Sequence, residues 1–116
     1  MSKLHQMKFK PLENNTSPMS DGEIEELHRQ IPDWQIIGAE GIPRLKREFK
    51  LKNYAEALSL TNAISELAER YGHHPLIELT WGRAAVQWWT HDIPGLGVND
   101  FIMAAKTDEI YKKLFS

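Results

Sequence analysis

Histidines and carboxylates that could exchange or orient protons are concentrated between positions 69 and 100. The candidates that we single out are Glu69, His73, His74, His91 and Asp100. Histidine loses its proton near neutral pH, so grouped imidazoles can donate and accept a proton within one reaction cycle. A neighbouring carboxylate can orient an imidazole or raise its pKa. These residue types indicate acid–base chemistry, provided that the fold brings them together.

A long helix is predicted to carry the first of these residues. Asn53 is a good N-cap with Glu56 three residues later, and Gly72 suits the left-handed conformation that commonly ends a helix. Glu69 then falls on the last turn, and two histidines follow the glycine. The apolar stripe expected to face the core comprises Ala57, Leu60, Ile64, Leu67 and Tyr71, widened by Tyr54, Leu58 and Ala68.

A predicted hairpin after this helix indicates that the histidines converge. Pro75 favours an extended path into a strand over Leu76–Trp81, and a second strand over Ala84–His91 follows a Gly-Arg turn. Hairpin partners run antiparallel, so the first strand starts where the second ends. His73, His74 and His91 should therefore meet at one end of the sheet.

Two other interpretations of these histidines stay open on spacing alone. Gly-His-His-Pro could be only a polar turn. Three histidines can also be the protein ligands of a zinc ion. Adjacent residues rarely bind the same ion, however, and the sequence contains no H-x-H or H-x-x-x-H pair. A metal-free acid–base site is the interpretation that we follow, with neither a metal nor a cofactor expected.

The remaining pattern predicts an α+β fold. A capped helix should begin at Ser20 and end near Gln30, followed by a hairpin of Trp34–Ile37 and Pro43–Leu51. A last helix should begin near Asn99 or Asp100. The order α-β-β-α-β-β-α predicts a four-stranded antiparallel sheet with three helices packed on one face. Arg47, on an otherwise apolar strand face, should pair with a helix carboxylate.

Length and composition narrow the class of protein. The 116 residues suit one domain, which we expect over residues 20–116 after a flexible N-terminal tail at 1–19. The formal charge is 14 − 16 = −2, which argues against direct nucleic-acid binding. The absence of cysteine excludes disulfides and thiol catalysis. No apolar run is long enough for a membrane helix, and no secretory signal is evident, so a cytoplasmic protein is expected.

The spacing of these residues resembles the pterin-4a-carbinolamine dehydratase family. The motif is Glu69, three residues, His73-His74-Pro75, five residues, Trp81, nine residues, His91, eight residues and Asp100. Upstream, Leu45-x-Arg47-x-Phe49-x-Leu51-x-x-Tyr54-x-x-Ala57 and Pro32-x-Trp34 are similar to further family segments. The departures there, Leu51 and Tyr54, are conservative. The resemblance extends from about Ser20 to Phe115.

The resemblance implies a hydro-lyase of pterin metabolism. Its reaction dehydrates 4a-hydroxytetrahydrobiopterin, or a bacterial relative, to the quinonoid dihydropterin, which recycles the cofactor of aromatic amino-acid hydroxylases such as phenylalanine hydroxylase. By position, His73, His74 and His91 correspond to the catalytic histidines, and the supporting or substrate-binding residues are Asp100, Glu69 and Trp34. It also implies a homodimer or homotetramer. We expect His73 and His91 to handle the proton and His74 to hold the pterin.

Two alternatives from other functional classes are kept. Members of the family also act as dimerisation partners of a transcription factor, which would make this chain an interaction module. The complete histidine set argues against that alternative, because binding alone has no need of it. The second alternative is a metal-dependent hydrolase, and analysis of the purified protein for bound metal would distinguish it from a metal-free dehydratase.

Overall fold

The order of elements follows the predicted alternation of helices and hairpins. A computed structural model describes residues 4–6, 19–39, 41–90 and 95–115. Its elements are a 3₁₀ turn η1 (Leu4–Gln6), α1 (Asp21–His28), β1 (Gln35–Ala39), β2 (Ile42–Lys50), α2 (Tyr54–Tyr71), β3 (Leu76–Thr80), β4 (Arg83–Trp88) and α3 (Val98–Phe115). The predicted α-β-β-α-β-β-α order is confirmed. No helix in the described part of the chain is long and apolar enough to span a membrane.

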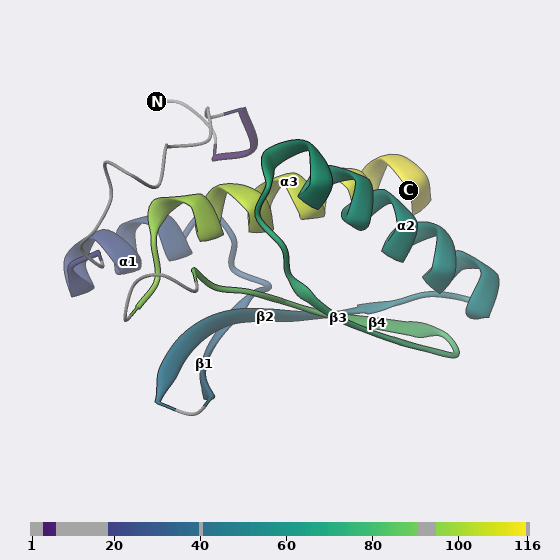
Figure 1. The fold of residues 1–116 in the computed structure, drawn as a ribbon, viewed down its shortest axis with the longest axis horizontal. Helices are drawn as coiled ribbons and strands as arrows, with labels where there is room; N and C mark the ends of the chain where they lie inside the picture. Colours follow the sequence, from purple (N-terminus) through teal and green to yellow (C-terminus); the bar gives the residue numbers. More distant parts are fainter. Residues whose placement is uncertain (1–3, 7–18, 40, 91–94, 116) are drawn as a thin grey trace.

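The four strands form one antiparallel sheet in the order β1-β2-β4-β3. The central pair, β2 and β4, aligns Leu45 with Trp88 and Phe49 with Ala84. Figure 1 shows α1, α2 and α3 on the same side of this sheet, as predicted. The two ends of β4 therefore lie under helices that come from distant parts of the sequence.

Local signals set the ends of the helices. The Ser20 hydroxyl accepts the Glu23 backbone N–H, and the Glu23 carboxylate accepts the Ser20 N–H, which completes a capping box. The side chain of Asn53 caps α2 by accepting the Glu56 N–H at 2.9 Å. Gly72 ends α2 with a φ of 64°, a conformation that costs a residue without a Cβ little.

The core lies between the sheet and the helices. Its sheet side is built from alternate residues of the central strands, and its helix side from α2 and α3. The largest contributors among these elements are Leu45, Phe49, Trp88, Leu60, Ile64, Phe101, Ile102 and Met103. The predicted stripe of α2 is confirmed at Ala57, Leu60, Ile64, Leu67 and Ala68, all of which are buried.

Several expectations at the edges of elements are wrong. Tyr54 and Leu58 do not widen the buried stripe of α2 but are exposed, because the sheet covers only one side of that helix. Trp81 lies in the β3–β4 turn and is 72% exposed. The last strand ends at Trp88 rather than extending to position 91, and α3 begins one residue earlier than expected.

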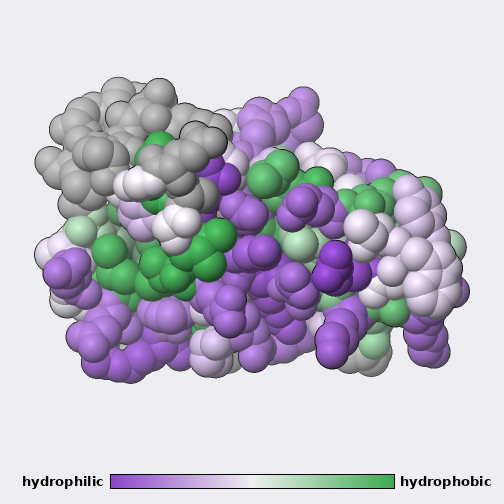
Figure 2. All heavy atoms as spheres, turned by 90° about the horizontal axis from the view of Figure 1, so that it is seen from below, coloured by the Kyte–Doolittle hydropathy of each residue, from purple (hydrophilic) through white to green (hydrophobic). Residues whose placement is uncertain are grey.

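The other face of the sheet carries polar and charged side chains. Alternation places Lys46, Glu48 and Lys50 opposite the core-facing residues of β2, and their partners on β4 include Gln87 and Arg83. Figure 2 views the molecule from this side, where hydrophilic residues predominate around a smaller hydrophobic patch. At the end of β4, the guanidinium of Arg44 lies 3.8 Å above the half-buried ring of Trp89. This face of the antiparallel sheet is therefore the side turned toward solvent.

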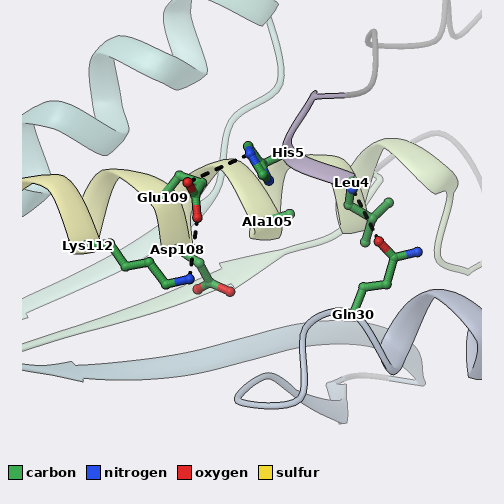
Figure 3. A pocket seen from close by; sticks show the side chains of 7 residues that line it. All are labelled: Leu4, His5, Gln30, Ala105, Asp108, Glu109 and Lys112. Carbon is green, nitrogen blue, oxygen red and sulfur yellow. Dashed lines mark hydrogen bonds and ion pairs between the residues drawn. The ribbon is translucent and has the colours of Figure 1, made fainter. Parts of the chain in front are cut away.

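The N-terminal turn packs on the helical layer. Leu4, within the segment expected to be a tail, is 1% exposed and belongs to the core cluster. Its backbone N–H donates to the Gln30 side chain, and the Lys106 ammonium donates to the His5 carbonyl at 2.8 Å. Figure 3 shows this turn against α3, beside a hollow of about 520 Å³. Leu4 thus ties the beginning of the chain to α1 and α3.

Candidate active site

A histidine and an aspartate form a buried pair between the end of α2 and the start of α3. His73 Nε2 lies 2.7 Å from Asp100 Oδ1, and the side chains are 5% and 0% exposed. The left-handed Gly72 turns the chain so that the His73 N–H bonds to the Ala68 carbonyl, which directs the residue back toward the core. Asp100 lies in the first turn of α3, where a negative charge is favoured by the helix dipole. Asp100 thus lies within hydrogen-bonding distance of one of the two adjacent histidines.

The second oxygen of Asp100 is held from two further segments. The Thr90 hydroxyl and the Gly97 backbone N–H each donate to Oδ2 at 2.9 Å. Thr90 follows β4, and Gly97 precedes α3. Three donors from three parts of the chain thus surround one buried carboxylate, which satisfies the requirement that buried charge be hydrogen-bonded.

An aromatic ring supports the imidazole of His73. The rings of His73 and Trp88 are stacked, with centroids 5.6 Å apart and an angle of 15° between their planes. Trp88 is itself anchored, because its Nε1–H donates to the Thr107 hydroxyl, which donates to the Met103 carbonyl. The plane of His73 is therefore set by stacking, and its rotation within that plane by Asp100.

His74 has a different environment from that of its neighbour. Its Nε2 lies 2.5 Å from Glu69 Oε2, and the two side chains are 61% and 78% exposed. Both residues line a surface hollow of about 410 Å³ between α2 and β3, together with Thr61, Ser65, Ala68, Pro75 and Ile77. A hollow of that volume is in the range of small-molecule sites. The predicted approach of Glu69 to a histidine is therefore observed at His74.

Two predicted site residues are not seen beside this pair. His91 lies outside the described residues, and the rings of His73 and His74 bond to different carboxylates, so no convergence of the predicted histidines is seen among the described residues. Trp34 is buried elsewhere, and its Nε1–H donates to Asp108 Oδ1 at 2.8 Å. Asp108 is eight residues beyond Asp100 on α3, about 12 Å along the helix axis at a rise of 1.5 Å per residue.

Asp108 is the helix carboxylate that the sequence predicted for Arg47. The guanidinium donates to Asp108 Oδ1 at 2.7 Å and lies 3.8 Å from Asp33. Burial raises the pKa of Asp108, an effect opposed by the hydrogen bond from Trp34 and by the charge of Arg47. Asp108 also lines the hollow beneath η1 (Figure 3), where Glu109 lies between His5 and Lys112. This second polar cluster is separate from the His73–Asp100 pair.

Sequence reasoning missed two buried polar residues. Thr90 falls inside the strand predicted over Ala84–His91, and nothing distinguished Thr107 from the polar face of a helix. A polar residue at a buried position of the predicted pattern is the signal that could have identified Thr90, because buried hydroxyls require partners. Among the described residues no group of three histidine or acidic side chains could hold a metal ion.

Comparisons with known proteins identify relatives over most of the chain. A family model described as "Pterin 4 alpha carbinolamine dehydratase" matches residues 17–110. A protein of Microcystis aeruginosa named "Putative pterin-4-alpha-carbinolamine dehydratase" is 48% identical over 113 residues, 97% of each chain. A protein of the same name from Nitrosococcus oceani is 54% identical over 94 residues, 81% of this chain and 83% of its own.

Solved structures share the fold. The crystal structure of a "transcriptional coactivator/pterin dehydratase" from Brucella melitensis matches with a TM-score of 0.72 and 28% identity, over 80% of this chain and 97% of that one. A pterin dehydratase-like protein described as a RuBisCO assembly factor of the alpha-carboxysome matches with a TM-score of 0.58 and 24% identity, over 67% of this chain and 88% of that one. The second likeness concerns the fold alone.

Proposed function

This chain belongs to the pterin 4-alpha-carbinolamine dehydratase family, and we propose that it dehydrates a 4a-hydroxytetrahydropterin by metal-free histidine acid–base catalysis. The observation that carries the proposal is the buried His73–Asp100 pair, at 2.7 Å. A carboxylate that accepts the Nε2 proton holds the imidazole in one orientation and fixes which ring nitrogen carries the proton. That is the property required of a group that donates a proton and then recovers one.

The reaction needs two proton transfers and no redox step. The hydroxyl on C4a leaves as water, so an acid must protonate its oxygen as the C4a–O bond breaks. N5 gives up its proton, and the electron pair released there forms the C4a–N5 double bond. One proton enters and one leaves, so a single imidazole, or two acting together, can complete the cycle. Positioned acid–base catalysis contributes about 10²–10⁴-fold to such a reaction.

The histidines have separate roles in this proposal. His73 handles the proton, because its ring is held by both Asp100 and Trp88. His74 and Glu69 contact the pterin from the rim of the hollow that they line. His91 stays in the catalytic set because of its spacing in the family motif. Trp34 acts on the site only through the packing of α3, since its indole bonds to Asp108.

A carbinolamine dehydration assay tests the proposal. Purified protein is added while a hydroxylase generates the 4a-hydroxypterin, and formation of the quinonoid product is followed by absorbance. We expect His73→Gln to lower kcat about 10²-fold or more, and the matched variant His5→Gln, on η1, to retain the wild-type rate. A wild-type protein that does not exceed the uncatalysed rate would overturn the proposal. Coupling to phenylalanine hydroxylase tests the expected role in recycling its cofactor.

Self-association is part of the same proposal. β3 is an edge strand, and its open side is flanked by Leu76 and Trp81, which are both exposed. Unpaired strand edges and exposed apolar side chains favour pairing with a second chain. We propose a homodimer or homotetramer built through this edge, and light scattering should report it. The double variant with Leu76→Asp and Trp81→Asp should be monomeric. Wild-type protein that is itself monomeric at micromolar concentration would contradict the proposed assembly.

An interaction module of the same fold is the alternative function. The name of the Brucella relative, which includes a transcriptional coactivator, and the exposed edge of β3 favour it. The two functions make different demands on the buried pair. Partner binding through β3 should survive His73→Gln, whereas dehydration should not.

A further inference from the structure

We propose that Thr90 is a positioning residue for His73 and that it acts through Asp100. The inference rests on the proposed function, because it concerns how the proton-handling histidine is held. The Thr90 hydroxyl donates to Asp100 Oδ2, at 2.9 Å, while His73 bonds to Oδ1.

The two oxygens of Asp100 have different tasks. Oδ2 accepts the hydroxyl of Thr90 and the backbone N–H of Gly97, and Oδ1 accepts from the imidazole. Two donors on Oδ2 fix the plane of the carboxylate. Oδ1 can then accept a hydrogen bond from the imidazole in only one direction. Asp100 is fully buried and Thr90 is 2% exposed, so water cannot replace the hydroxyl without a rearrangement.

This arrangement determines the tautomer of His73. An ionised carboxylate is only an acceptor, so the ring nitrogen facing it, Nε2, carries the proton. Proton exchange during the reaction then takes place at Nδ1. Stacking on Trp88 keeps the ring plane constant while the proton moves, because stacking depends little on which nitrogen is protonated. Thr90 therefore contributes to the choice of the nitrogen that does the chemistry.

Thr90 is the member of this network that substitution can remove most cleanly. Gly97 donates from its backbone, which no side-chain change eliminates. Valine has nearly the shape of threonine but lacks the hydroxyl, so Thr90→Val leaves Oδ2 with one donor. Serine retains the hydroxyl and should restore the hydrogen bond. A matched control is Thr80→Val, which makes the same change at the exposed last residue of β3, whose hydroxyl donates to the Arg83 carbonyl.

Kinetics in the dehydration assay give the first test. We expect Thr90→Val to lower kcat about 10- to 100-fold, the range for losing a buried hydrogen bond to a charged group, with KM changed less than about twofold. The kcat of Thr90→Ser should stay within about threefold of the wild-type value, and the kcat of Thr80→Val should equal the wild-type value. Active wild-type protein with an equally active Thr90→Val variant overturns the inference and leaves the proposed function intact. Inactive wild-type protein overturns the proposed function instead.

Nitrogen-15 NMR of the His73 ring gives a second test that needs no substrate. In the wild type, the neutral ring should be protonated at Nε2, and Thr90→Val should convert it to a mixture of tautomers that Thr90→Ser does not show. A purely structural role for Thr90 would lower stability without moving these ring signals. Should Thr90→Val fail to fold, the wild-type spectrum still decides, because a neutral His73 protonated at Nδ1 overturns the inference.

Discussion

His73 and His74 are neighbours in the chain, yet their rings bond to carboxylates in opposite environments. His73 bonds to Asp100 in the interior, and His74 bonds to Glu69 on the surface. The left-handed Gly72 immediately before them makes this divergence possible, because it ends α2 and lets the next residue turn inward. Adjacent residues of the same type therefore should respond very differently to the same substitution.

Alanine replacements of the two histidines should separate them by stability. Sequence position alone suggests a cost of about 1 kcal/mol or less for either residue, because both lie at element ends. Burial changes that expectation for His73, whose loss leaves Asp100 without its Oδ1 partner and should cost about 2–3 kcal/mol. His74→Ala should stay within about 0.5 kcal/mol of wild type. Urea unfolding measures both, and equal costs would contradict the different environments.

Activity should be insensitive to removal of metal ions. The two described histidines of the candidate site face different carboxylates, so their nitrogens do not converge on one point. We expect overnight dialysis against a chelator to leave turnover unchanged, and added zinc to give no increase. Loss of activity on dialysis and its recovery with zinc would favour the metal-hydrolase alternative.

The N-terminal turn should contribute to stability rather than to catalysis. Leu4 is buried against α3, so Leu4→Ala should lower the free energy of unfolding by about 2–3 kcal/mol. Leu114→Ala, the same change at an exposed position near the end of α3, serves as the matched control. Both variants should retain wild-type kcat at a temperature where they are folded. A Leu4→Ala variant as stable as its control would mean that the turn does not pack as described.

Asp108 should make stability depend on pH in the acidic range. Burial raises its pKa in the folded protein above the unfolded value, so the folded state binds the proton more tightly. The resulting stabilisation is complete below the unfolded pKa and is lost as pH rises through the folded pKa. The stability of wild type relative to Asp108→Asn should therefore fall as pH rises from about 3 to 7.

Urea unfolding across that range gives the measurement for Asp108. Asp21→Asn removes an exposed carboxylate at the start of α1 and should leave the pH dependence nearly parallel to that of wild type. If the stability difference between wild type and Asp108→Asn instead increases with pH, the ion pair with Arg47 outweighs the burial of Asp108.

The sequence alone predicted the elements and one of the polar pairs of the interior. Periodicity and caps identified the helices and hairpins, because a capped helix or a half-buried strand depends on residues a few positions apart. Arg47 on an apolar strand face required a carboxylate on a helix, and Asp108 supplies it. The association of Asp100 with the histidines was implied by the family motif.

Only the tertiary structure decided which groups touch. Thr90 reaches Asp100 and Trp88 reaches Thr107 because β4 runs beneath α3, a contact between surfaces that local pattern does not encode. Trp34 lies against Asp108 rather than beside His73, and Asp108 is eight residues beyond Asp100 on α3. The different burial of His73 and His74 also results from packing between segments that are distant in the sequence. Burial depends on what covers a residue from elsewhere in the chain, whereas the sequence specifies directly only what stands next to it.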